Sequence, residues 1–303
     1  MENSIIEAAA ALIRAGQLVA FPTETVYGLG ANALDPEAVA RIYAAKGRPL
    51  SSPLIVHCAG TASARSLAAV WPAAADILAA RFWPGPLTLV LPKRADIPDT
   101  VTAGLATVGL RVPDHPIALA LIRSAGVPIA APSANEFMQL SPTTAEHVRA
   151  GLGLRVAAVL DGGPARVGIE STVLSLAGER PVLLRPGMIG REQIEQVLGY
   201  SIDLPGAVDA TAHPAPGMHE RHYSPRAPLF LFRHAFGRAG RGVVLPVDEI
   251  GTDAAQYARR LYAALHEADQ PGVEWIAVEE PPEGPEWSGI HDRLRRAAQQ
   301  PLA

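Results

Sequence analysis

The chain has 303 residues, of which 49% are hydrophobic and 18% are charged, and its formal net charge is −4. This composition is typical of a folded globular protein with room for two domains, and it excludes an intrinsically disordered chain. The acidic balance argues against stable nucleic-acid binding by bulk electrostatics. The single cysteine, Cys58, excludes an internal disulfide and a paired-cysteine metal site.

The sequence also predicts the cellular location of the protein. No apolar run approaches the roughly 20 residues that a membrane-spanning helix needs. The acidic N-terminal stretch, with Glu2 and Glu7, lacks the basic region of a secretory signal peptide. We therefore expect a cytoplasmic protein that does not associate with a membrane.

The first elements expected along the chain are a helix and a short strand. Ser4 followed by Glu7 forms a capping box before an apolar segment that ends at Gly16, and this pattern predicts a helix. A strand is predicted at 18–21. The next residues, 23–30, are rich in threonine and glycine, which favours a loop.

A second helix is predicted to bring two cations to the edge of the sheet. Asp35 suits the N-cap position and Pro36 the first helical position, so the helix begins there. It ends beside Lys46 and Arg48, and both can project into the crevice where open α/β sheets bind ligands. The buried strand that follows carries His57 at its tip.

Helices and strands alternate through the next part of the chain, and the last strands follow one another directly. Strands are predicted at 54–56, 87–91, 107–112, 127–131, 157–160, 172–176 and 182–184. Helices are predicted at 62–69, 73–82, 116–125, 145–150 and 192–198. Because the late strands have no helices between them, we expect a mixed sheet rather than a parallel one.

A change of composition separates a second domain. Residues 201–228 are rich in proline, glycine and histidine, which predicts a linker. Its HERH segment, 219–222, lacks the spacing of a zinc site, so we expect no metal there. We therefore expect a first domain at 1–200 and a small α/β domain at 229–303. The elements expected in the small domain are strands at 229–232, 242–246 and 275–278 and helices at 254–266 and 292–299.

The motifs of several common enzyme classes are missing. The sequence has no GxxxxGK[ST] loop, GxGxxG fingerprint, GxSxG elbow, HExxH motif or kinase signature. It does place four cations at strand or helix ends: Lys46, Arg48, Arg111 and Arg185. Four cations in one crevice would repel each other, which predicts a polyanionic ligand such as a nucleoside triphosphate. Transfer at phosphorus then needs positioning, charge neutralisation and Mg²⁺ on the phosphates, without a protein nucleophile.

Nine motifs between about residues 5 and 200 identify a family. In order they are PTETVYGLG, KGRP, PLIVH, FWPGPLT, VTAGLATVGLRVP, PIAAPSAN, SPT, GIEST and LRPG. Together they resemble the YrdC-like family of L-threonylcarbamoyladenylate synthases. The later PGMHERHYSP and EWSGIHDRLRRAA resemble the linker and accessory domain of its two-domain members. The resemblance implies a twisted mixed α/β sheet with a concave cationic cleft, plus a small C-terminal α/β domain.

The resemblance also implies a reaction. L-Threonine, bicarbonate and ATP would give threonylcarbamoyl-AMP and pyrophosphate, with Mg²⁺ held through the ATP phosphates and with no organic cofactor or protein metal site. The product would pass to the tRNA threonylcarbamoyl-transferase machinery, which modifies adenosine 37 of tRNA.

Matched motif by motif, the resemblance assigns site residues. The catalytic set would be Lys46, Arg48, Ser133 and Asn135. ATP would be bound by Arg48, Ser52, Thr107, Ser133, Ser141, Arg185 and Tyr223, the last of these lying on a linker that covers the nucleotide as a lid. L-Threonine would be bound by Thr25, His57, Arg111, the backbone of Ala131, and Ser171, with Arg111 facing the amino acid's carboxylate.

Three positions depart from the family pattern, and two other functions stay open. Ser52 stands where asparagine is usual. Glu136 stands where a small or basic residue is common, and Met138 stands where glycine is common. One alternative is a double-stranded RNA-binding module, which a steep salt dependence of RNA binding would support. The other is a carbamoyl-adenylate-using transferase, whose relatives usually carry further domains.

Overall fold

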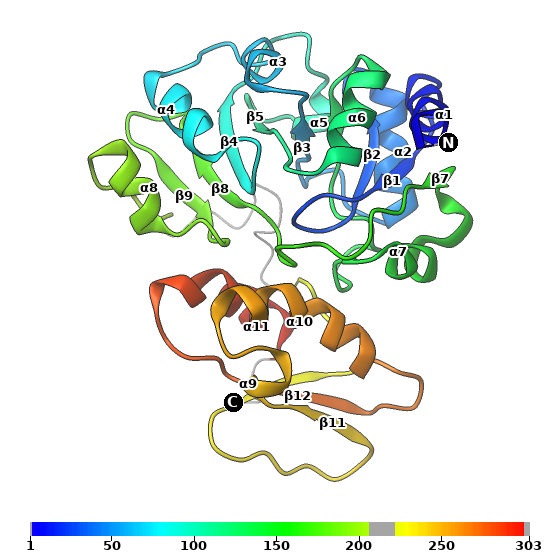
Figure 1. Ribbon diagram of the computed structural model, residues 1–303, viewed down its shortest axis with the longest axis vertical. Helices are drawn as coiled ribbons and strands as arrows, with labels where there is room; N and C mark the ends of the chain where they lie inside the picture. Colours follow the sequence, from blue (N-terminus) through cyan, green and yellow to red (C-terminus); the bar gives the residue numbers. More distant parts are fainter. Residues whose placement is uncertain (1, 206–221, 300–303) are drawn as a thin grey trace.

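The computed structural model describes residues 2–205 and 222–299, and Figure 1 shows that they form two domains. The strands of the larger domain are β1 (Val19–Phe21), β2 (Gly28–Asn32), β3 (Ile55–His57), β4 (Leu87–Pro92), β5 (Thr107–Arg111), β6 (Ile129–Ala130), β7 (Ala158–Val159), β8 (Thr172–Ser175) and β9 (Val182–Arg185). Its helices are α1 (Glu2–Arg14), α2 (Pro36–Lys46), α3 (Thr61–Arg65), α4 (Ala73–Phe82), α5 (Asp99–Thr102), α6 (Pro116–Ala125), α7 (Ala145–Leu152), η1 (Gly153–Arg155) and α8 (Arg191–Leu198). The smaller domain contains β10 (Leu229–Phe232), β11 (Gly242–Leu245), α9 (Val247–Ile250), α10 (Ala254–Ala268), β12 (Trp275–Glu279), η2 (Pro285–Trp287) and α11 (Ser288–Ala297).

The larger sheet is mixed, as the run of late strands predicted. Its strand order is β7-β1-β2-β6-β3-β5-β4-β8-β9, with both parallel and antiparallel neighbours. Side chains alternate between its faces. Val19 and Phe21 pack with α1 and α6 on one face, while Ala20 packs with α2 on the other.

Two predictions about the first 30 residues were wrong. Residues 28–32 form strand β2, where the threonine- and glycine-rich pattern favoured a loop. A side chain at Gly30 would lie 2.8 Å from both Phe21 and Ile129, so this glycine serves close packing rather than a turn. Ser4 is also not the N-cap of α1, because the helix already begins at Glu2. Burial of its apolar face stabilises this helix without that cap.

Local sequence sets the ends of α2. The Asp35 carboxylate accepts hydrogen bonds from the backbone N–H groups of Glu37 and Ala38, and Pro36 occupies the first turn. Gly47 ends the helix with φ of 62°, a left-handed conformation that favours glycine. These caps confirm the helix that the sequence predicted and fix the segment that carries Lys46 and Arg48.

Strand register brings distant segments to one edge of the sheet. His57 pairs with Arg111 at the ends of the parallel strands β3 and β5. Strand β4 runs antiparallel to β5 and parallel to β8, so the start of β8 lies at the edge where β5 ends. Arg185 ends β9 and pairs with Val173 of β8. The side chains at these strand ends therefore face a common region.

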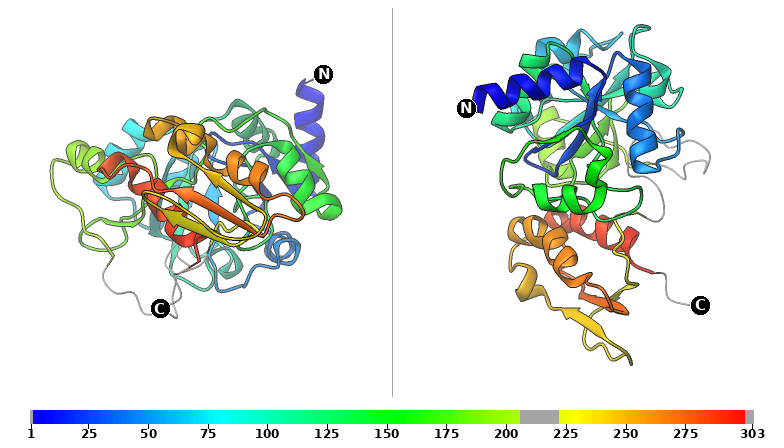
Figure 2. Two further views of the ribbon diagram at one scale, coloured as in Figure 1. Left: turned by 90° about the horizontal axis from the view of Figure 1, so that it is seen from below. Right: turned by 90° about the vertical axis from the view of Figure 1, so that its right-hand side faces the viewer.

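The smaller domain is a parallel three-stranded sheet, β10-β12-β11, whose helices α10 and α11 lie between that sheet and the larger domain (Figures 1 and 2). The two domains share one apolar cluster, in which Val26 and Ile169 join Tyr257 and Leu261 of α10. At α11, a side chain on Gly289 would come within 2.9 Å of the Gly187 backbone. The helices thus pack directly against loops of the larger domain. No helix in residues 2–205 and 222–299 is long and apolar enough to cross a membrane.

Candidate active site

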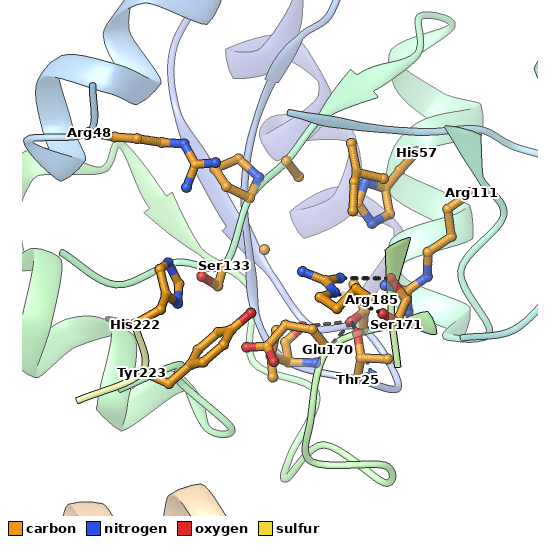
Figure 3. Close-up of a pocket in the computed structure, with 16 residues that line it drawn as sticks. Thr25, Arg48, His57, Arg111, Ser133, Glu170, Ser171, Arg185, His222 and Tyr223 are labelled. Carbon is orange, nitrogen blue, oxygen red and sulfur yellow. Dashed lines mark hydrogen bonds between the residues drawn. The ribbon is translucent and has the colours of Figure 1, made fainter. Parts of the chain in front are cut away.

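A pocket lies at the common edge of the strands (Figure 3). Three of its lining residues are arginines, and one, Glu170, carries a carboxylate. The lining comprises Thr23, Thr25, Val26, Gly28, Arg48, Ile55, His57, Arg111, Ala131, Pro132, Ser133, Glu170, Ser171, Arg185, His222 and Tyr223. In the view of Figure 3, Arg48 and Arg111 lie on opposite sides and Arg185 lies between them. Three of the four predicted cations therefore meet in one place.

Arg111 forms one wall of the cavity. Its Nη2 lies 2.8 Å from Oε1 of Glu24, and both side chains are buried. The same nitrogen donates to the Thr25 hydroxyl at 2.9 Å, and Nε donates to the Gly85 carbonyl. Its other terminal nitrogen, Nη1, has no hydrogen-bond acceptor among the described residues, which leaves it for an anionic group in the cavity.

His57 lies at the tip of β3, beside Arg111. Its ring packs edge-on against Phe21, with centroids 6.0 Å apart. Burial and the Arg111 charge lower the pKa of His57 to about 3. The imidazole is therefore neutral at physiological pH and can contribute only a neutral donor or acceptor to a ligand.

Arg185 and Ser171 lie together on the central wall. The guanidinium donates to the Ser171 carbonyl at 3.1 Å and to its hydroxyl at 3.2 Å. That hydroxyl also shares a hydrogen bond with Thr88 at 2.8 Å. Hydrogen bonds therefore connect the segment before β8, the end of β9 and strand β4 beside the cavity.

Arg48 and Lys46 have different positions. Arg48 lines the cavity, and its guanidinium donates to the carbonyls of Ser52 and Pro53. Burial lowers its pKa to about 10, so it remains cationic at neutral pH. Lys46 does not line the cavity. Its Nζ donates instead to the carbonyls of Ser133, at 2.5 Å, and of Asn135, and so stabilises the SAN segment, residues 133–135.

The loop after the SAN segment explains one departure from the family pattern. Met138 has φ of 69°, in the left-handed region that favours glycine. Asn135 closes the loop by donating to the carbonyls of Glu136 and Gln139. The carboxylate of Glu136 pairs with Arg155, at 2.5 Å. Methionine is thus accommodated where the backbone itself calls for glycine.

Tyr223 enters the cavity from the C-terminal side. Its φ is 63°, and its ring contacts those of His222 and Tyr262, with centroids 4.0 and 6.0 Å away. The Tyr223 hydroxyl is buried without a hydrogen-bond partner in the described part of the chain, and Figure 3 draws it pointing toward the cavity. A strained backbone and an unpaired hydroxyl are features of residues held for function rather than for stability. The HERH pattern begins at His219, and its first three residues lie outside the described ranges.

Five predicted site residues do not line the cavity: Lys46, Ser52, Thr107, Asn135 and Ser141. Four of them contact a lining residue or support its segment. The Ser52 carbonyl accepts from Arg48, the Ser141 hydroxyl donates to Glu170 at 2.5 Å, and Lys46 ties Asn135 to Ser133. Thr107 does neither. It begins β5, about 13 Å along the strand from Arg111, which ends β5 at the cavity.

Sequence reasoning did not select three residues of this region: Glu24, Glu170 and His222. The two carboxylates stand inside the PTET and GIES motifs, and His222 stands inside HYSP. A charged residue flanked by apolar residues and hydroxyls was the available signal for the carboxylates. Their buried partners, Arg111 and Arg293, lie far away in sequence.

Two family models match the chain. The Sua5–YciO–YrdC model, described as "Telomere recombination", matches residues 11–187. A second model, described as "Threonylcarbamoyl-AMP synthase, C-terminal domain", matches residues 189–299. The two matches cover both domains.

Curated relatives and solved structures agree with these models. A threonylcarbamoyl-AMP synthase of Bacillus subtilis is 46% identical, over 97% of this chain and 92% of that protein. One of Pyrococcus abyssi is 44% identical, over 98% of this chain and 95% of the relative. The crystal structure of P. abyssi Sua5 complexed with L-threonine superposes with a TM-score of 0.91 at 42% identity, covering 98% and 95% of the two chains. The mixed sheet and the second domain expected from the sequence are thereby confirmed.

Proposed function

The chain belongs to the Sua5–YrdC family of threonylcarbamoyl-AMP synthases, in its two-domain form, and on this premise we propose how its cavity joins ATP, bicarbonate and L-threonine. It is a nucleotidyltransferase that serves threonylcarbamoyladenosine formation in tRNA. The observation that carries the assignment of roles is the gathering of three buried arginines around one cavity. Such a site suits a polyanion bound beside a small zwitterion.

L-Threonine would bind at the Arg111 end. Arg111 is held by Glu24 and Thr25, so its free nitrogen can meet the amino acid's carboxylate. The neutral His57, the Ala131 backbone and the Ser171 hydroxyl line the same region and offer polar groups to the threonine amine and hydroxyl. The P. abyssi structure complexed with L-threonine supports a threonine site in this fold.

ATP would bind between Arg48 and Arg185, with the Ser133 hydroxyl and Tyr223 beside it. Mg²⁺ would enter bound to the ATP phosphates, as part of that substrate. The nearby carboxylates, Glu24 and Glu170, already pair with arginines, which supports a metal held mainly by phosphate oxygens. The predicted ATP contacts of Ser52, Thr107 and Ser141 and the predicted catalytic roles of Lys46 and Asn135 stay proposals.

The chemistry needs no covalent intermediate on the protein. The threonine nitrogen bonds to the bicarbonate carbon and water leaves, which gives a carbamate. A carbamate oxygen then bonds to the α-phosphorus of ATP, and pyrophosphate leaves with the electrons of the broken phosphorus–oxygen bond. Arg48 and Arg185 would neutralise the charge that develops on the phosphates, and the cavity would align the reactants. We further propose that this happens in the cytoplasm and that the product passes to the tRNA-modifying machinery.

The assignment is tested by substrate dependence. Conversion of ATP to AMP and pyrophosphate should require both L-threonine and bicarbonate, measured as pyrophosphate release with each component omitted in turn. L-Serine lacks one methyl group and should react with kcat/KM lower by about tenfold or more. Equal product with L-serine, or product in bicarbonate-free buffer, would refute the proposed substrate set.

Tyr223 should act mainly on nucleotide retention. Tyr223→Ala removes a buried ring beside the proposed ATP site and should raise the KM for ATP by about tenfold, with a smaller change in kcat. Tyr223→Phe keeps the ring and loses only the hydroxyl, so it separates packing from hydrogen bonding. Steady-state kinetics at varied ATP would decide, and a Tyr223→Ala enzyme with an unchanged KM for ATP would rule out the lid role.

A further inference from the structure

Glu170 is the one carboxylate among the residues that line the cavity, and the accessory domain holds it. Its Oε2 accepts from Nε of Arg293 at 2.7 Å and from the Tyr262 hydroxyl at 3.1 Å. Its Oε1 accepts from the Ser141 hydroxyl. Two of these three donors belong to α11 and α10, so a cavity residue depends on a different domain for its hydrogen bonds.

Arg293 also holds the backbone on both sides of the Ser171–Arg185 pair. Its Nη2 donates to the carbonyl of Glu170 at 3.1 Å, next to Ser171. Its Nη1 donates to the carbonyl of Pro186 at 2.8 Å, next to Arg185. Arg293 is 1% exposed, so none of these bonds is shared with bulk water. One guanidinium thus fixes the spacing of two segments that carry cavity side chains.

The contact between Arg293 and Glu170 also changes the electrostatics of the cavity. An unpaired carboxylate in a buried cavity would repel a triphosphate strongly, since the surroundings screen charges poorly. Burial opposes the charge of Glu170, yet Arg293 and Arg185 together lower its pKa, so the carboxylate is ionised and neutralised. The Arg293 guanidinium also lies over the Tyr223 ring, 5.3 Å from its centroid. The accessory domain therefore touches both Glu170 and the residue that borders the proposed nucleotide site.

We propose that Arg293, assisted by Tyr262, is a positioning residue for the reaction: it neutralises Glu170 and sets the Ser171–Arg185 pair, which makes the accessory domain part of the ATP site. The inference deepens the proposed function and rests on it. It assigns the smaller domain a task in nucleotide binding beyond its support of the linker.

Arg293→Met in the full-length protein tests this role. It leaves Glu170 charged without its main partner, and the KM for ATP should rise by about tenfold or more while the KM for L-threonine changes less. Arg295→Met is the matched control, because Arg295 is exposed on the same helix and its Nε donates only to the His291 carbonyl. The control should keep the wild-type kinetics. All assays are run below the melting temperature of each variant.

A second substitution separates charge from folding. Adding Glu170→Gln to Arg293→Met removes the uncompensated charge but not the lost backbone contacts, so the double variant should lower the KM for ATP toward the wild-type value without reaching it. Tyr262→Phe removes one donor with little change in packing and should raise the KM for ATP by a smaller factor. A melting temperature that falls in Arg293→Met while its KM for ATP stays within twofold of wild type would overturn the proposal. Because wild-type turnover is measured in parallel, inactivity of the wild type would instead count against the proposed function itself.

Discussion

Arg48→Ala should lower kcat/KM for threonylcarbamoyl-AMP formation by about 10³-fold with the fold intact. Arg48 lines the cavity, is 7% exposed, and has its guanidinium fixed by two carbonyls and by the Phe137 ring, 5.8 Å away. A fixed cation in a cavity shielded from water stabilises charge on a transferring phosphoryl group far more than a solvated one does. Pyrophosphate release measures the loss, and far-ultraviolet circular dichroism checks the fold.

Two variants sharpen this test. Arg41→Ala removes an exposed cation from α2, the helix that ends two residues before Arg48. Arg41 donates to the Gly16 carbonyl, and its loss should leave the rate unchanged. Arg48→Lys keeps the charge but loses the planar fork, so it should restore only part of the rate. If Arg48→Ala turns over at the wild-type rate, this cation has no part in the mechanism.

Arg111→Met should reduce both stability and L-threonine binding. It leaves Glu24, which is 2% exposed, as a buried charge with no other ion-pair partner among the described residues. Breaking a buried pair in this way costs about 3–5 kcal/mol of unfolding free energy. The KM for L-threonine should rise as well, because the proposed carboxylate contact is lost. Denaturant unfolding and kinetics at varied L-threonine measure the two effects.

Arg111→Lys separates these effects. A lysine keeps a positive charge near Glu24, so much of the unfolding free energy should return, but it lacks the fork that can hold Glu24, Thr25 and a ligand together. The KM for L-threonine should therefore stay high. An Arg111→Met protein with a normal KM for L-threonine would show that this arginine serves the fold alone.

Local signals in the sequence were enough for most elements. The Asp35–Pro36 cap and Gly47 mark the two ends of α2, and the apolar runs mark β4 and β10. Strand β2 was missed because its glycines follow the rule for turns, whereas they are needed for contact with Phe21 and Ile129. Such a requirement depends on which strands become neighbours, and no local pattern records it.

The same distinction between local and long-range signals applies to the candidate site. Cations at strand ends, such as Arg111 and Arg185, could be selected from the chain because topology places strand ends together. The buried pairs could not. Glu24 meets an arginine 87 positions away, and Glu170 meets one 123 positions away in another domain. Lys46 donates to the carbonyls of the SAN segment and does not line the cavity. This position likewise depends on how two loops pack.

The apolar cluster shared by Val26, Ile169, Tyr257 and Leu261 bears on how this architecture can be re-engineered. Although the composition of the chain changes near residue 200, the hydrophobic core continues across that boundary. Exchanging the C-terminal module between homologues would transplant half of a hydrophobic interface, so a functional chimera must carry the matching apolar residues of both halves.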